Sequence, residues 1–367
     1  MKSNPRKGLK LRKLVIDNYK ALDHLELEFP EPRMPDDPDM VVIGSENGVG
    51  KTSVLECCAL IVMACEPPEL GEAHLDFDTY ELEVDPYELV IRSGCKEASI
   101  HADLRVGDSR CGPTLSMMRG TTKVAEEVGD VQDYFKDVAS RGHAPIEDRV
   151  RSLLGFDTDP LVQPGLVYFH SYRKVQEGRP ELGMMVDERH SRRPGFRKFP
   201  QRKPRSLISA FKLEIVRLMM SKADLFEEQT GEQAASEYQK LNELLGEYAG
   251  VTLEKLRPLR DSSVEIRLQP KTGEASYSFD GLSSGQKEII STLFLIWRHA
   301  KQTPGIILID EPELHLNAGW HRPFMKRLLE LAPNSQFILA THSRDVFESI
   351  PLDRRILLEP SKGVLVS

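Results

Sequence analysis

Short runs of apolar residues, separated by helical stretches, dominate the pattern along the chain. The runs are Met40–Ile43, Leu166–His170, Ile306–Ile309 and Phe337–Ala340. Apolar runs of this length are typical of strands buried on both faces of a sheet. Helical stretches are predicted at 51–65, from about 284, and near 320–331. Because buried strands alternate with helices, the sequence predicts a central, mostly parallel sheet of the α/β class.

A second pattern, in which apolar and polar residues alternate, predicts antiparallel strands. It covers Leu25–Phe29 and residues 100–106, and we predict further strands at 11–16 and 89–92. These segments indicate an antiparallel β subdomain that flanks the central sheet. Residues 107–160 are mixed and polar, and one helix is expected there, at Pro145–Leu154. Two hairpins are predicted near the C-terminus, over 264–279 and around 359–362.

Residues 174–262 interrupt the α/β pattern. Amphipathic helices are predicted around 207–218 and 238–248, so the segment reads as a mainly helical insertion. The predicted organisation is a core segment over 1–173, this insertion, and a second core segment over 263–367. Within the insertion, residues 188–205 hold eight Arg or Lys and three Pro against one acid. This basic loop is either a solvated segment or a contact for nucleic acid or for an acidic protein.

Composition narrows the classes of protein. The net charge is −8, from 57 acidic against 49 basic residues, which argues against a protein that coats nucleic acid over its whole surface. Five cysteines form no CxxC pair, so we expect buried reduced thiols. The chain shows no secretory signal and no apolar stretch near the length of about 20 residues that a membrane helix needs. We therefore expect a cytoplasmic location.

The segment Gly44–Thr52, GSENGVGKT, lies between a predicted strand and a predicted helix. A loop of this kind turns its backbone N–H groups towards phosphates, and the start of the helix adds a favourable dipole. Lys51 would reach the β- and γ-phosphates and Thr52 would bind Mg²⁺. The strict pattern needs glycine at position 45, where this chain has Ser45. The candidate nucleotide-binding residues are Ser45, Glu46, Asn47, Gly48, Val49, Gly50, Lys51, Thr52 and Ser53.

A pair of acids, Asp310 and Glu311, follows the apolar run at 306–309. Asp310 would thus lie at the carboxyl end of a buried strand, where ligands bind in open α/β sheets. Asp310 suits a contact with Mg²⁺, direct or through water, and Glu311 suits polarising the attacking water. Alone, the pair could be a solvated acidic turn. Together with the phosphate loop it predicts a nucleotide hydrolysis site.

Two further motifs are weak on their own. Leu282–Gln286, LSSGQ, opens a predicted helix, and Ser283 would ordinarily be read as a helix cap. His342 follows the run at 337–340 in the sequence ATHS, where a lone histidine is usually structural.

The order of these motifs resembles that of the ATP-binding-cassette (ABC) ATPases. Within them the chain is similar to the branch of RecF, the SMC heads and the OLD proteins, which includes AAA-family ATPases of bacterial phage-defence systems. The opening Leu14–Ala21, the run Asp310–Leu316 and the segment Ala340–Ser343 carry this likeness. Asn317-Ala318 stand where the branch often has His-Pro. The resemblance covers the ATPase parts and leaves out about 174–260.

The resemblance implies ATP and Mg²⁺ as cofactors and a head-to-tail homodimer. One subunit would offer its phosphate loop, and the other would offer Ser283, Gly285 and Gln286 to the γ-phosphate. Lys51, Glu311 and His342 would be catalytic, and Thr52 and Asp310 would hold the metal. The family also has a glutamine loop. Gln176 or Ser171-Tyr172-Arg173 are its candidates here.

The favoured function is an ATPase that controls a separate effector, a nuclease or a toxin, in antiphage defence. The alternative is a RecF-like ATPase of DNA repair or of a DNA clamp. A transporter subunit and a non-hydrolysing scaffold are less favoured. Only 25 residues follow His342, so we expect no Toprim domain of the kind that OLD nucleases carry. We also expect no SMC arm, because the sequence shows no long heptad tract.

Overall fold

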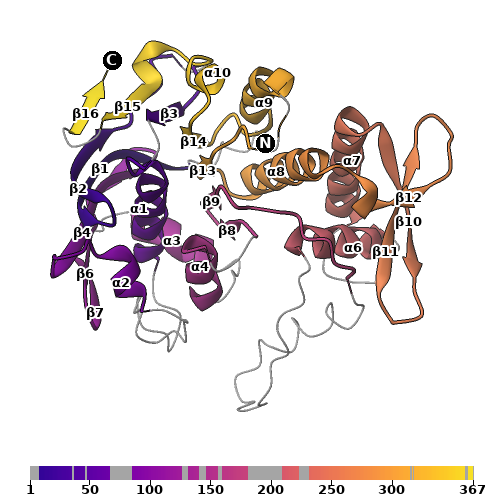
Figure 1. The fold of residues 1–367 in the computed structure, drawn as a ribbon, viewed down its shortest axis with the longest axis horizontal. Coiled ribbons are helices and arrows are strands. Elements are labelled where there is room, and N and C mark those ends of the chain that lie inside the picture. The colour runs from indigo at the N-terminus through magenta and orange to yellow at the C-terminus, as the bar shows by residue number, and fades with distance from the viewer. Residues whose placement is uncertain are drawn as a thin grey trace. The chain divides into compact units, whose positions relative to one another are not determined.

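Figure 1 shows the fold of the protein in a computed structural model. It describes residues 8–34, 37–45, 48–66, 85–125, 131–139, 146–155, 159–180, 209–222, 231–314, 316, 318–359 and 363–366. The chain divides into two compact units. The first contains Met1–Tyr172 together with His299–Ser367, and the second contains Arg173–Arg298. The three-segment organisation expected from the sequence stays a prediction.

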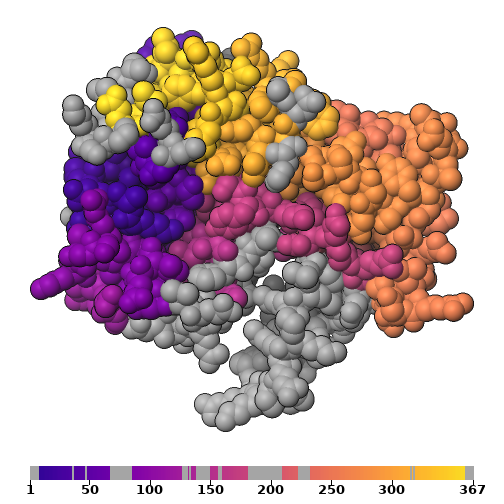
Figure 2. Space-filling model, viewed as in Figure 1, coloured from indigo at the N-terminus to yellow at the C-terminus, as the bar shows by residue number. Residues whose placement is uncertain are grey.

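A seven-stranded, mostly parallel sheet forms the centre of the first unit. Its strand order is β16-β15-β3-β14-β13-β9-β8. The five inner strands are parallel to one another, and the edge strands β16 and β8 are antiparallel to their neighbours. The strands are β3 (Met40–Ser45), β8 (Leu161–Gln163), β9 (Leu166–Phe169), β13 (Ile306–Asp310), β14 (Gln336–Thr341), β15 (Arg355–Glu359) and β16 (Gly363–Val366). The predicted parallel sheet is confirmed. Because β15 pairs with β3, the C-terminal residues (yellow) lie beside the N-terminal ones (indigo) in Figure 2.

A six-stranded antiparallel sheet accompanies the central sheet in the same unit, as the sequence predicted. Its order is β2-β1-β4-β6-β7, with β5 paired to β4. Its strands are β1 (Leu9–Tyr19), β2 (Leu22–Glu28), β4 (Glu97–Val106), β5 (Ser109–Cys111), β6 (Thr114–Met118) and β7 (Thr121–Ala125). The burial of β1 and β4 alternates along their length, which is expected for strands with one face on the core.

Helix α1 (Lys51–Ala64) contacts strands of both sheets. Each of its residues except Thr52 is buried, and a helix that is buried all round belongs to a core. This burial fixes the start of α1, and therefore the phosphate loop, relative to the central sheet. The other helical segments of the unit are α2 (Pro86–Val90), α3 (Val131–Ala139), α4 (Ile146–Leu153), α9 (Ala318–Leu331), α10 (Arg344–Phe347) and η3 (Leu352–Arg354).

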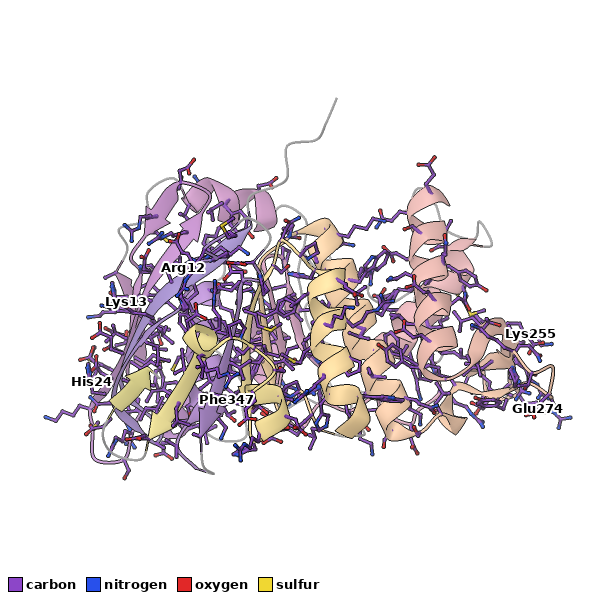
Figure 3. The ribbon with its side chains drawn as sticks, turned by 90° about the horizontal axis from the view of Figure 1, so that it is seen from above. Arg12, Lys13, His24, Lys255, Glu274 and Phe347 are labelled. Carbon is purple, nitrogen blue, oxygen red and sulfur yellow. The ribbon has the colours of Figure 1, made fainter. Side chains whose placement is uncertain are left out.

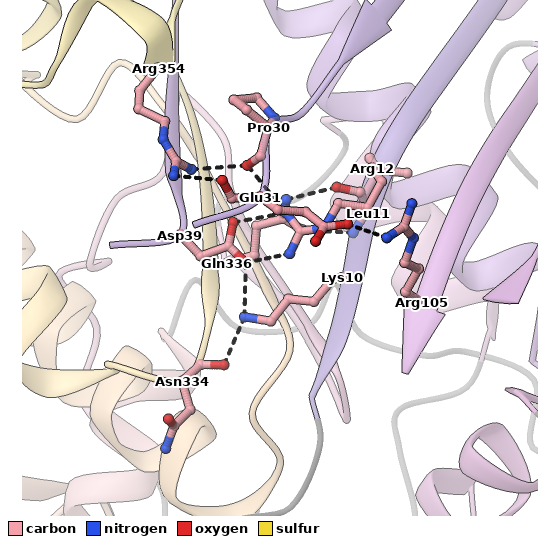
Figure 4. A network of polar contacts seen from close by, with 10 residues as sticks. All are labelled: Lys10, Leu11, Arg12, Pro30, Glu31, Asp39, Arg105, Asn334, Gln336 and Arg354. Carbon is pink, nitrogen blue, oxygen red and sulfur yellow. Dashed lines mark hydrogen bonds and ion pairs between the residues drawn. The ribbon is translucent and has the colours of Figure 1, made fainter. Parts of the chain in front are cut away.

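A network of polar contacts joins β1 to the central sheet (Figure 4). The Arg12 guanidinium donates to both carboxylate oxygens of Asp39, at 3.0 and 2.8 Å. The side-chain amide of Gln336 exchanges two hydrogen bonds with the backbone of Leu11, at 2.7 and 2.8 Å. Asp39 precedes β3 and Gln336 begins β14. These contacts therefore hold the antiparallel sheet against the strands that carry the candidate site.

The second unit combines helices with a three-stranded antiparallel sheet. Its helices are α6 (Ala210–Lys222), α7 (Gly231–Tyr248), the short η2 (Phe279–Gly281) and α8 (Ser284–Gln302), and its strands are β10 (Val251–Pro258), β11 (Val264–Pro270) and β12 (Tyr277–Ser278). The last residues of α8 fall in the first unit. The ring of Phe211 on α6 packs against Phe294 on α8, with ring centroids 5.9 Å apart. Arg298 on α8 forms ion pairs with Glu214 on α6 and Glu237 on α7.

Some expectations for the segments between motifs were wrong. The strand expected at 89–92 is instead the helix α2 followed by a single bridge at Ile91. The Asp85 side chain accepts a hydrogen bond from the Tyr87 N–H, and Pro86 stands at the first helical position, so this segment starts as a helix. Residues 109–125 contain three strands that we did not expect. The basic loop at 188–205 lies outside the described residues, and none of the helices that are described is long and apolar enough to cross a membrane.

Candidate nucleotide site

The candidate residues gather where three neighbouring parallel strands end. β14 lies between β3 and β13, with Gly44 opposite Thr341 and Asp310 opposite Ala340. The phosphate loop leaves β3, His342 follows β14, and Asp310 ends β13. Since parallel strands carry their carboxyl ends to the same edge of a sheet, the sheet itself brings these segments together.

The phosphate loop has the backbone expected of such a loop. Gly48 and Gly50 have φ angles of 81° and 101°, in the left-handed region that favours glycine. A side chain on Gly50 would also meet Leu22 Cδ2 at 2.6 Å. Val49 packs against the core and Ser53 is buried in the first turn of α1, while Glu46 and Asn47 lie outside the described residues.

The phosphate loop departs from the strict pattern because it has Ser45 where the pattern needs glycine, with Gly44 one residue earlier. The structure explains both residues. A Cβ atom on Gly44 would lie 2.7 Å from two ring carbons of Phe347 in α10, so a larger residue at position 44 would displace that ring (Phe347 is labelled in Figure 3). The Lys51 ammonium donates to the Ser45 hydroxyl at 2.8 Å and to the Ser45 carbonyl at 3.2 Å. Ser45 therefore supplies a side-chain acceptor for Lys51 that glycine at the same position would lack.

Thr52 and Asp310 meet at the start of α1. The Thr52 hydroxyl donates to Asp310 Oδ2 at 2.7 Å, and Asp310 is only 1% exposed. A hydroxyl and one carboxylate fit Mg²⁺, which usually takes one or two carboxylates together with substrate phosphates and water. The described residues contain no cluster of three His, Cys, Asp or Glu side chains that could hold a metal by themselves. The donor set therefore suits a metal that is bound together with a phosphate ligand.

Lys51, His342 and Glu311 form a chain of polar side chains. Lys51 Nζ lies 3.2 Å from His342 Nδ1, and His342 Nε2 lies 3.8 Å from Glu311 Oε1. Burial lowers the pKa of Lys51, and the negative charges of Asp310, Glu311 and Glu313 oppose that shift. The side chains of His342 and Glu311 are about one third exposed, at 34% and 30%, so both remain accessible to a ligand.

The turn after β13 contains a residue that the sequence did not single out as a site residue. Glu311 has a left-handed φ of 47°, and its N–H donates to the Ala340 carbonyl at 2.8 Å. Glu313 then turns its carboxylate towards the loop after β14, where it accepts hydrogen bonds from Thr341 and from the backbone of His342 and Ser343. In the sequence Glu313 was a third acid, two residues beyond Glu311, inside the run Asp310–Leu316 that carries the family likeness.

The signature segment LSSGQ lies in the second unit, at the start of α8. The Gln286 N–H donates to the Ser283 hydroxyl at 3.2 Å, and the Ser283 N–H donates to Gln286 Oε1 at 3.0 Å. This reciprocal pair is a capping box. Ser283 is exposed and Gly285 is half-buried, and Gln286 also donates to the Tyr248 carbonyl at 3.2 Å.

The residues after β9 bear on the position of a glutamine loop. Phe169 pairs with Ile309, so His170 and Tyr172 leave the sheet beside the strand that carries Asp310. Their rings are stacked, with centroids 4.2 Å apart. Burial, and next the negative charges of Glu56 and Asp310, raise the pKa of Tyr172 to about 12. Gln176 belongs to the second unit, so its role stays a prediction.

A phosphate loop on β3, an acid pair after β13 and a histidine after β14 define the class as an ABC-type P-loop ATPase. The fold agrees with this class. An SMC head bound to the C-winged helix domain of ScpA matches with a TM-score of 0.55 and 13% identity over 97% of both chains. A RecF structure matches with a TM-score of 0.50 and 12% identity over 98% of both chains.

The chain belongs to the AAA-domain family, whose description reads "AAA domain" and whose match covers residues 13–254. A second AAA-domain description, which also mentions the AbiEii toxin and type IV TA systems, matches residues 172–347. Two curated relatives are the Retron Vc95 probable ATPase of Vibrio cholerae, 35% identical over 83 residues, and the Retron Ec83 probable ATPase of Escherichia coli, 29% identical over 134 residues. The matches cover 20% and 30% of this chain, and 16% and 25% of those relatives.

Proposed function

We propose that this protein binds ATP with Mg²⁺ and hydrolyses it slowly to ADP and phosphate. The observation that carries the proposal is the convergence of Lys51, Thr52, Asp310, Glu311 and His342 at one edge of the central sheet. An ammonium and a hydroxyl–carboxylate pair suit the binding of phosphates with a metal ion, and a glutamate beside a histidine suits the positioning of an attacking water, which together support phosphoryl transfer to water.

Each residue has a role that its surroundings support. Lys51 and the N–H groups of the loop hold the phosphates, and Thr52 with Asp310 holds the metal ion. Bound Mg²⁺ would neutralise phosphate charge as it develops. Glu311 orients and polarises the attacking water, and its left-handed backbone directs that carboxylate. His342 contacts the γ-phosphate from the same subunit.

Removal of the Lys51 ammonium tests the site. Lys51→Ala should abolish both ATP binding and phosphate release. The matched control is Lys326→Ala, which removes a lysine whose side chain is 81% exposed on α9. The control should behave as the wild type. Phosphate release that persists unchanged in Lys51→Ala, at equal purity, would show that the turnover occurs elsewhere.

We further propose a head-to-tail dimer in which each ATP lies between the phosphate loop of one subunit and the LSSGQ segment of the other. The exposure of Ser283 at a helix N-terminus supports this arrangement. Glu311→Gln should bind ATP without hydrolysing it, so closed dimers should accumulate. Ser283→Arg should block closure by bulk and by charge.

A mixing experiment separates a shared site from an independent one. Lys51→Ala and Ser283→Arg should each be inactive alone. A mixed dimer keeps one site in which an intact loop faces an intact signature, so partial activity should return on mixing. The dimer proposal is wrong if no activity returns although both mutants are folded and exchange subunits.

The ATPase cycle would then control a separate effector, a nuclease or a toxin, in antiphage defence. The names of the two curated relatives support this role, because each is named as the probable ATPase of a retron. The alternative is a RecF-like role at DNA, which the fold shared with RecF leaves open. ATPase assays with and without duplex DNA distinguish the two, since a DNA clamp should respond to DNA.

We propose that the basic loop at 188–205 docks the partner, and its neutralisation should leave basal ATP hydrolysis intact.

A further inference from the structure

The carboxylate of Glu313 lies just beyond the acid pair and is turned towards β14. Oε1 accepts hydrogen bonds from the backbone N–H groups of His342 and Ser343, both at 2.9 Å. Oε2 accepts one from the Thr341 hydroxyl at 2.7 Å. One side chain therefore binds three consecutive residues: the last residue of β14 and the first two residues of the loop that joins β14 to α10.

These contacts fix the backbone on which the His342 side chain stands. Thr341 is 1% exposed and is held in the sheet, while His342 is already outside it. The Thr341 hydroxyl also accepts the Ser343 N–H at 2.9 Å, and the Ser343 hydroxyl accepts the Val346 N–H at 3.4 Å to cap α10. The loop thus leaves the sheet in one defined direction, which Glu313 sets.

The direction of the loop decides where the imidazole lies. His342 Nδ1 is 3.2 Å from Lys51 Nζ, and its Nε2 is 3.8 Å from Glu311 Oε1. A rotation of the loop backbone would move both ring nitrogens away from these partners. Hydrogen bonds to a charged acceptor are about twice as strong as neutral ones, so Glu313 is well suited to prevent such a rotation.

We propose that Glu313 is a positioning residue that holds His342 beside Lys51 and Glu311 and so sets the rate of ATP hydrolysis rather than ATP affinity. The inference rests on the proposed ATPase function. It assigns Glu313 no contact with substrate, because its carboxylate is engaged by Thr341, His342 and Ser343.

The test compares Glu313→Ala with Glu313→Gln in the full-length protein. A glutamine oxygen can still accept both backbone N–H groups, and its amide can donate to Thr341. Glu313→Ala should lower kcat about 10- to 100-fold, the size expected when a catalytic group is displaced by about 1 Å. The ATP dissociation constant should stay within about twofold, and Glu313→Gln should restore most of kcat. Glu330→Ala, which removes a partly exposed glutamate on α9, is the matched control and should change neither.

A double mutant tests whether Glu313 acts through His342. In the His342→Ala background, the further change Glu313→Ala should produce no additional loss of kcat, because the group that it positions is absent. An equal loss in both backgrounds would overturn the proposal, as would a Glu313→Gln variant as impaired as Glu313→Ala. Thermal unfolding of every variant identifies any loss that comes from unfolding.

A readout without turnover keeps this inference distinct from the proposed function. The imidazole signal of His342 in a protein labelled at histidine, assigned with His342→Ala, should shift in Glu313→Ala and stay in place in Glu313→Gln. If the wild type binds ATP without hydrolysing it, hydrolysis is refuted while the histidine signal still tests the positioning. A signal unchanged in Glu313→Ala would refute the positioning alone.

Discussion

Replacement of Gly44 by alanine should destabilise the first unit through a single steric conflict. A Cβ atom at position 44 would lie 2.7 Å from Phe347 Cδ2 and Cε2. Carbon atoms in favourable contact are about 3.5 to 4.0 Å apart, so the two groups must separate by about 1 Å. β3 is fixed by β14 on one side and β15 on the other, so the Phe347 ring and α10 must move.

The cost follows from what the ring contacts. Phe347 is half-buried, and the Arg355 guanidinium lies 5.8 Å from its ring centre. Extra volume at a packed site typically costs about 1 to 3 kcal/mol, and we expect Gly44→Ala to lower the free energy of unfolding by that amount. Because α10 follows the His342 loop, the same shift should lower kcat more than it weakens ATP binding.

Urea unfolding, followed by far-UV circular dichroism, measures the effect. The matched control is Gly112→Ala, where the new Cβ would lie at an ordinary 3.5 Å from His101 Cε1 and φ is not in the left-handed region. That change should be neutral, or stabilising by about 0.4 to 1 kcal/mol, because alanine restricts the unfolded chain. Phe347→Leu should relieve the conflict. The steric reasoning is refuted if Gly44→Ala and Gly112→Ala have equal effects, or if Gly44→Ala costs as much beside Leu as beside Phe.

Two further predictions concern buried ionisable groups. Burial lowers the pKa of His299 to about 4, so this side chain stays neutral in the folded protein above that pH. In the unfolded chain the same histidine gains a proton below about pH 6.5. The free energy of unfolding therefore falls as the pH drops from 6.5 towards 4. Between pH 7 and pH 5 this should cost about 2 kcal/mol, and urea unfolding of His299→Leu should show a correspondingly smaller drop. Lys212 is buried, donates to the Gly178 carbonyl at 2.9 Å and forms an ion pair with Asp280. Lys212→Met should therefore lower the free energy of unfolding by about 1 to 3 kcal/mol. The double mutant Lys212→Met with Asp280→Asn should lose less, because it leaves no unpaired carboxylate.

The central sheet and its motifs could be predicted because several independent patterns agree there. Apolar runs in the sequence predicted β3, β13 and β14. The phosphate loop, the acid pair Asp310-Glu311 and His342 lie at or just after the ends of these runs. Parallel pairing then brings the strand ends together, which is why Asp310 was expected beside the phosphate loop. The place of His342 at the same site was implied by the resemblance. The resemblance implied a glutamine loop, and β9, which precedes its candidates, ends beside β13. The sequence did not decide which residue after β9 would sense the site.

The three strands in residues 109–125 were not predicted, because their patterns of apolar and polar residues are short. Leu115 and Met117 are the buried residues of β6, but Met118 is also apolar, so the alternation in the sequence covers only four residues inside a polar stretch and is a weak pattern. At 89–92 the apolar run Leu89-Val90-Ile91 outweighed the helix-start signal of Asp85 and Pro86. That local capping signal determines the structure there.

The role of Glu313 could not be read from the sequence for a geometric reason. Spacing along the chain predicts neighbours only within a regular helix or strand, and Glu313 lies in a turn. The left-handed φ of Glu311 redirects the chain after β13, and the carboxylate reaches residues of β14 and its loop as a result. No periodicity encodes such a turn, so the contact becomes visible only in three dimensions.

For Ser283 the structural and the functional reading are compatible. Its hydroxyl caps the Gln286 N–H, which is the ordinary role of serine before a helix. The first N–H groups of a helix have no partner within the helix, so a cap that accepts one of them still leaves donors for an anion. Ser283→Ala removes the hydroxyl, and with it the cap, whereas Ser283→Arg also adds bulk and charge. A difference between these two variants in the mixing experiment therefore isolates the block to dimer closure from the stability of α8.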